Sequence, residues 1–143
     1  MRKLGFTLIE LLVVTTIISL LSGIGLVSYT QFIKKSRDER RKADLNNIRS
    51  ALEMYRSDND TYPQSLDYLI GEPKYLETLP EDPKGFTYQY KALPDGCDGS
   101  AILCTDYILY AYLETGGKCV TSQTCGSVTC NYCIGPYGEK TTD

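Results

Sequence analysis

Lys3-Leu4-Gly5-Phe6-Thr7-Leu8-Ile9-Glu10 opens the most distinctive part of the chain, an apolar run that continues to Val27. The 22 residues from Phe6 to Val27 would make a helix about 33 Å long, against a bilayer hydrocarbon core of about 30 Å. The run therefore predicts a membrane-spanning helix. Glu10 is its only carboxylate. A charge at mid-bilayer costs about 2.5–3.5 kcal/mol, so Glu10 is expected to have a partner.

The basic leader, Gly5, the motif Phe6-Thr7-Leu8-Ile9-Glu10 and the apolar run together resemble the class III signal of type IV pilins and type II secretion pseudopilins. This resemblance implies that a prepilin peptidase cleaves between Gly5 and Phe6 and that the new Phe6 amine is N-methylated. It also implies that mature chains polymerise through their helices. The Phe6 amine of one subunit would then neutralise Glu10 of its neighbour, which makes Glu10 the predicted assembly residue.

Two other interpretations of the same stretch compete with this one. A secretory signal peptide has an apolar region of about 7–15 residues and a small-x-small cleavage site, whereas this run is longer and carries an acid. An ordinary membrane anchor would have no reason to keep Glu10. Both are therefore less favoured than the pilin-like signal.

Apolar residues beyond the run keep a spacing of three and four, which predicts that the helix continues with one side on a head domain. Ser57-Asp58-Asn59-Asp60 and then Pro63 end it, giving one helix of about 50 residues. The residues expected to face inward are Leu45, Ile48, Leu52 and Tyr55. The expected segments are a leader at 1–5, a membrane or filament-core helix at 6–27, its amphipathic continuation at 28–56, a loop at 57–85, and a β-sheet with a Cys-rich region at 86–143.

The sequence from Ala51 to Tyr90 carries a second resemblance, to the major pseudopilin and its close pilin relatives. It rests on the pairs Met54-Tyr55, Asp58-Asn59 and Tyr62-Pro63, on Leu79-Pro80-Glu81-Asp82-Pro83 and on Gly85 to Tyr90. Beyond it, 86–91 alternates apolar and polar residues as a half-buried strand does. Further strands are expected at 107–113, 119–121 and 127–134, the last with a stapled loop as its alternative. Short turns between strands imply an antiparallel sheet and an α+β head, with Tyr88, Tyr90 and Tyr107 in its core.

Six cysteines lie in the last 47 residues, an even number that suits disulfides in an oxidising compartment. Sequence does not choose among the 15 possible pairings; the pairing we favour joins Cys97 to Cys104 and uses the other four to staple the C-terminal loop. A four-cysteine zinc site or a redox Cys-x-x-Cys pair stays open as an alternative. The candidates are Cys97, Cys104, Cys119, Cys125, Cys130 and Cys133.

Charge is unevenly distributed around a formal net charge of −3. The segment 34–42 carries +4 and the segment 43–143 carries −8. The positive-inside rule alone would place the head in the cytoplasm, but the cysteines and the N-terminal motif place it outside. We expect this basic collar to face the acidic head of another subunit. Asp38 and Glu39 interrupt it, which argues against nucleic acid.

Histidine is absent, which excludes Ser-His-Asp and Cys-His catalysis and any zinc site that uses histidine. We expect no enzyme activity and no cofactor. Resemblance to major pseudopilins implies a calcium site, for which Asp95, Asp98 and Asp106 are weak candidates, because their spacing matches no familiar calcium loop. Disulfides are expected to take over its structural role.

These observations predict a structural subunit of a type IV pilus-like filament. One alternative is the major pseudopilin of a type II secretion system; another is a membrane-anchored binding protein that never polymerises. The resemblance implies a prepilin peptidase, an assembly ATPase and an inner-membrane platform protein as partners. The chain would cross the cytoplasmic membrane once before assembly, with its head outside, and then join a cell-surface pilus or a periplasmic pseudopilus.

Overall fold

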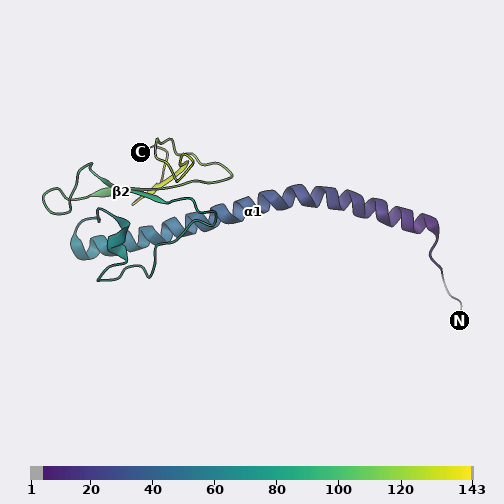
Figure 1. Ribbon diagram of the computed structural model, residues 1–143, viewed down its shortest axis with the longest axis horizontal. Coiled ribbons are helices and arrows are strands. Elements are labelled where there is room, and N and C mark those ends of the chain that lie inside the picture. Colours follow the sequence, from purple (N-terminus) through teal and green to yellow (C-terminus); the bar gives the residue numbers. More distant parts are fainter. Residues whose placement is uncertain (1–4, 143) are drawn as a thin grey trace.

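A computed structural model describes residues 5–142, without the side chains of 24–28. One helix, α1 (Leu8–Asn59), runs the length of the molecule; its second half lies along a small head and its first half extends away from it (Figure 1). Four of the five residues of the expected leader, 1–4, lie outside the described residues. Within the described part, no helix is both long enough and apolar enough to qualify as a membrane span.

The helix has defined caps at both ends. It begins at Leu8 because Thr7, in an extended conformation, is its N-cap. It ends at Asn59 because Asp60 adopts a left-handed conformation (φ 58°) and donates its N–H to Arg56 O at 2.8 Å; aspartate is one of the few non-glycine residues that tolerate this geometry. The prediction of one helix of about 50 residues ending at 57–60 is confirmed.

The head contains a four-stranded antiparallel sheet with the strands in chain order (Figure 1). Strands that follow one another in the chain are neighbours in the sheet, so the sheet is a simple meander. Only the turn between the last two strands is short, whereas residues 94–105 and 112–131 form long connections. A short 3-10 helix, η1 (Leu66–Leu69), precedes the sheet in the loop after α1. With the long helix on one side, this confirms the α+β class. The strands are β1 (Gln89–Leu93), β2 (Asp106–Ala111), β3 (Tyr132–Gly135) and β4 (Gly138–Lys140).

The strand predictions were only partly right. The expected strand at 107–113 matches β2, and that at 86–91 is shifted by about three residues to β1. The segment 119–121 is not a sheet strand; it makes one isolated bridge, Val120 to Thr142. Only the end of 127–134 pairs, as β3, because the residues before it belong to the stapled loop. Strand β4 was missed because three residues are too few to show a period of two.

Both faces of the sheet are covered, by different parts of the chain. Tyr107 and Leu109 of β2 pack in the core that contains Leu45, Ile48 and Leu52 of α1, as predicted for those helix positions. The intervening Ile108 and Tyr110 pack against Cys119, Cys125, Cys130 and Cys133 on the other face. Alternation along a strand places these two sets on opposite faces. Tyr107 is fully buried, whereas Tyr55, Tyr88 and Tyr90 are partly buried at the edge of the helix-side core.

All six cysteines pair within the chain. The bonds join Cys97 to Cys104, Cys119 to Cys133 and Cys125 to Cys130. This confirms the expected bridge across the 97–104 turn and the use of the other four cysteines to staple the C-terminal loop. This pairing contradicts both alternatives, because no thiol is free to bind zinc and the two cysteines of the Cys-x-x-Cys motif, Cys130 and Cys133, bond to other partners.

The Cys119–Cys133 bond fastens the loop to β3 and gives a testable stability effect. Replacing both residues by serine should lower the free energy of unfolding by about 3 kcal/mol, because a cross-link closing a loop of this length restricts the unfolded chain. Urea unfolding of the detergent-solubilised protein measures the loss. The Cys97–Cys104 bond closes a shorter loop, so replacing these two cysteines by serine should lower the free energy of unfolding by somewhat less. Equal stability of the wild type and both double variants would contradict the account.

Candidate assembly site

Glu10 is held by its own helix cap. Its Oε2 accepts hydrogen bonds from Thr7 N (2.8 Å) and Thr7 Oγ1 (2.7 Å), and Thr7 Oγ1 accepts from Glu10 N at 3.4 Å. This reciprocal arrangement is a capping box. The sequence analysis missed this role of Thr7, although a Thr-x-x-Glu pattern before an apolar run is its signature. Both side-chain bonds end on Oε2, so capping does not require Oε1.

The surroundings of Glu10 are apolar and uncovered. Phe6 is 82% exposed and Ile9 69%, and these residues line a shallow hollow beside Glu10 together with Val13 and Val14. Large apolar side chains remain exposed as far as Leu21. An exposed apolar surface of this extent marks a region that a membrane or a partner covers.

A second polar site lies where α1 meets the head, and we call it the junction cluster. It contains three cations and three carboxylates from three separate parts of the chain, which balances its formal charge. Its members are Arg37, Asp38 and Arg41 of α1, Asp82 and Lys84 of the loop after η1, and Glu114 just after β2.

Arg41 is the centre of the junction cluster and is fully buried. Its Nε and Nη2 contact the two oxygens of Asp82 at 2.5 and 3.2 Å, and Nη1 donates to Asp38 Oδ1 at 2.8 Å and Glu114 Oε1 at 3.0 Å. Hydrogen bonds to these three carboxylates raise the pKa of Arg41 further above its usual value despite the opposing effect of burial. The planar guanidinium thus fixes helix, loop and sheet relative to one another.

The carboxylates of the junction cluster are held in their charged form. Burial would raise the pKa of Asp38, but hydrogen bonds from Thr115 Oγ1 and from the amides of Glu114 and Thr115 outweigh it, and the pKa is lowered. The pKa of Asp82 is also lowered, because its bonds to Arg41 outweigh burial. The bidentate contact with Arg37, at 2.6 and 2.7 Å, is the main reason why the pKa of Glu114 is far below its ordinary value.

This arrangement corrects, for Arg37 and Arg41, the expectation that the basic collar at 34–42 faces the acidic head of another subunit. Asp38 and Arg41 are buried, and Arg37 and Arg41 are neutralised by acids of their own head. The signal was present in the sequence. Positions 38, 41, 45, 48 and 52 follow one spacing of three and four, so the polar pair continues the apolar stripe that faces the head.

The three aspartates considered for calcium are not brought together as a binding site. Asp95 pairs with Lys91, Asp106 pairs with Lys140, and Asp98 accepts the amides of Ser100 and Ile102. Within residues 5–142, no group of three acidic, cysteine or histidine side chains is arranged to hold a metal. Calcium needs six to eight oxygen ligands, so the described residues do not fit this ion.

Sequence models of known families match both the N-terminal motif and the segment that follows it. A sequence model of the prokaryotic N-terminal methylation motif matches residues 1–26, and one of type II secretion system (T2SS) protein G matches residues 28–101. The chain belongs to the T2SS protein G family. No solved structure gives a significant match to this family member.

Similar curated proteins point the same way. The chain is 32% identical over 103 residues to a type II secretion system core protein G of Aeromonas hydrophila, covering 62% of this chain and 72% of that protein. It is 35% identical over 106 residues to the protein of the same name from Pseudomonas aeruginosa, covering 64% and 75%. These names favour the pseudopilin alternative over the type IV pilus that the sequence analysis put first.

The junction cluster makes stability depend on pH. The lowered carboxylate pKa values stabilise the fold above the unfolded-state values of about 3.9 for Asp and 4.3 for Glu, and this contribution is lost as pH falls toward the folded-state values. The Asp82→Asn variant should therefore be about 3 kcal/mol less stable than the wild type at pH 7, because one partner of a buried ion pair is lost. Its free energy of unfolding should also fall less than that of the wild type on acidification. Urea unfolding from pH 7 to 2 measures both effects. Asp95→Asn, which alters an exposed pair, is the control and should follow the wild type.

The aspartate arrangement predicts no effect of calcium on stability. Thermal unfolding of the purified protein should give the same midpoint in excess calcium and in chelator, since a ligand that binds only the folded state would raise it. A higher midpoint in calcium would show a site that the described residues do not explain.

Proposed function

We propose that this chain is the major pseudopilin of a type II secretion system, the subunit that polymerises into its periplasmic filament. The observation that carries the proposal is the methylation motif at 1–26 joined directly to a protein G match at 28–101. The subunit acts by assembly and catalyses nothing. Movement of secreted proteins would be driven by growth of the filament.

Processing prepares the subunit for assembly. Cleavage between Gly5 and Phe6 creates an α-amine one residue before the N-cap Thr7. In the filament, this amine neutralises Glu10 of a neighbour. The capping contacts support this step, because Thr7 bonds only to Oε2 of Glu10 and capping leaves Oε1 able to accept the incoming N–H.

The exposed first half of α1 has two successive environments in this proposal. Before assembly, it lies in the cytoplasmic membrane with the head outside, where the disulfides can form. After assembly, it packs against the same segment of other subunits in the filament core. A prepilin peptidase, an assembly ATPase and a platform protein are the proposed partners.

Replacement of Glu10 tests polymerisation. Glu10→Ala should abolish filaments and protein secretion, because the neighbour's amine would be buried without its counter-charge. Electron microscopy and immunoblotting of sheared periplasmic or surface material, with an assay of the secreted proteins, give the two readouts. Glu77→Ala changes an exposed acid in the loop after η1 and is the matched control.

The outcomes separate the three candidate functions. Filaments and secretion lost together support the pseudopilin. Filaments lost together with surface motility or attachment, while secretion continues, would indicate a type IV pilus. A wild-type chain that stays monomeric in the envelope, with an intact Met1, would indicate an anchored binding protein.

A further inference from the structure

We propose that Tyr137 of one subunit inserts into an apolar hollow on the opposite flank of a second copy, and that this contact joins neighbouring heads in the filament. The inference rests on the proposed function, since it names the head-to-head contact of the same polymer. It uses two features outside the N-terminal site, one of which, the hollow, shares only Asp82 with the junction cluster.

The first feature is an aromatic side chain displayed on a tight turn. Tyr137 is 92% exposed, more than Phe6 at the bare end of the helix. It sits between β3 and β4, where Gly135 pairs with Gly138. Arg49 Nη2 donates to the carbonyl of Pro136 at 2.7 Å and fixes the turn against α1. A tyrosine ring has only two side-chain torsions, so it presents a large contact area and loses little conformational freedom on binding.

The second feature is a hollow of about 310 Å³ between α1 and the segments 79–82 and 85–88. Its apolar lining includes Ile48, Leu66, Leu79 and Phe86. An engineered apolar cavity of about 150 Å³ holds a benzene molecule, so this hollow has room for a phenol ring.

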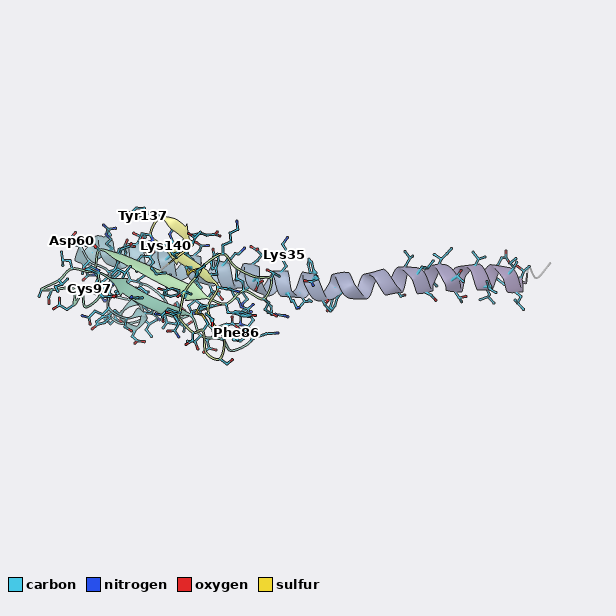
Figure 2. All side chains as sticks on the ribbon, turned by 90° about the horizontal axis from the view of Figure 1, so that it is seen from above. Lys35, Asp60, Phe86, Cys97, Tyr137 and Lys140 are labelled. Carbon is cyan, nitrogen blue, oxygen red and sulfur yellow. A yellow bond between two sulfur atoms is a disulfide. The ribbon has the colours of Figure 1, made fainter. Side chains whose placement is uncertain are left out.

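The ring and the hollow lie on opposite flanks of the head. Tyr88, which lines the hollow, donates its hydroxyl to Asp44 at 2.8 Å, whereas Arg49 holds the Tyr137 turn. Five residues separate Asp44 and Arg49, which is about 140° around a helix. Figure 2 shows Phe86 and Tyr137 on opposite sides of the helix axis. A contact between two different surfaces of identical subunits is heterologous, and it extends into an open filament when the rotation between copies does not close a ring.

The two features also lie at matching heights along the helix. Pairing of Phe6 with Glu10 of a parallel neighbour offsets the copies by four residues, about 6 Å. The turn held by Arg49 of the lower copy then stands level with position 45 of the upper copy. The hollow of the upper copy is lined by Ile48 of α1 and by Tyr88, whose hydroxyl donates to Asp44 of α1. Position 45 lies between these two helix residues.

Charge at the two surfaces is complementary. The guanidinium of Arg49 lies at the base of the Tyr137 turn. Glu81 is exposed at the rim of the hollow, while the other acid of its lining, Asp82, is already paired with Arg41. Arg49 of one copy can therefore face Glu81 of the next, which favours this register over others.

Photo-crosslinking in the assembled filament tests the contact directly. Cells that assemble full-length protein with p-benzoyl-phenylalanine at position 137 are irradiated, and the crosslinked protein is purified from the envelope. The expected product is a covalent dimer whose crosslink maps by mass spectrometry to residues 79–88 of a second copy. The same probe at Tyr68, another exposed tyrosine, should give no crosslink to that segment. Dimers linked elsewhere, or monomer only, would overturn the proposal.

Two variants measure how much the contact contributes. Tyr137→Ala and the hollow-filling Thr87→Trp should each reduce sheared filaments by about 10-fold or more, the effect of losing a buried aromatic anchor. The Tyr137→Phe and Thr87→Ser variants should form nearly as much filament as the wild type, because the first keeps the aromatic ring and the second keeps the hollow open. All four should retain the wild-type unfolding midpoint.

The result is distinguishable from failure of the proposed function. If Glu10→Ala abolishes filaments but Tyr137→Ala and Thr87→Trp leave their amount unchanged, this inference is wrong and the pseudopilin assignment stands. If the wild type forms no filaments, both are wrong.

Discussion

The buried guanidinium of Arg41 connects three parts of the chain that are distant in sequence. Apolar contacts such as those of Leu45 and Leu52 tolerate some sliding, because they have little directional preference. The hydrogen bonds from Arg41 to Asp82 and Glu114 of the head do not tolerate it. Displacing the head by one helical turn would leave a charge buried without its partners, which is strongly unfavourable. The cluster therefore fixes the position of the head along α1.

Much of this architecture could be predicted because the helix has a strong periodic signal. The apolar stripe, the end of the helix near Asp60 and the α+β class all followed from residue spacing and turn chemistry. The junction cluster was missed because a charged run usually faces solvent. In the sequence, only their position on the apolar stripe distinguishes Asp38 and Arg41 from the solvent-facing charged residues of the same run. The partners Asp82 and Glu114 are brought in by tertiary structure, which local patterns do not report.

The disulfides explain how a small head covers both faces of its sheet. The helix covers one face, and the loop containing Cys119, Cys125 and Cys130 covers Ile108 and Tyr110 on the other. This loop has almost no regular structure, and small domains of this kind commonly rely on cross-links. The protein G match ends at residue 101, so two of the three disulfides lie beyond it. The same region misled the strand predictions, because cysteine pairing rather than strand pairing holds it.

The side-by-side packing of α1 and the head also determines how the molecule carries mechanical load. A force applied along α1 reaches the head through Arg41, Leu45, Ile48 and Leu52, which are distributed along the helix axis. These contacts are sheared together instead of being peeled apart one after another. A piston-like filament built from such subunits would transmit thrust from its core to its outer surface without concentrating stress at any single contact.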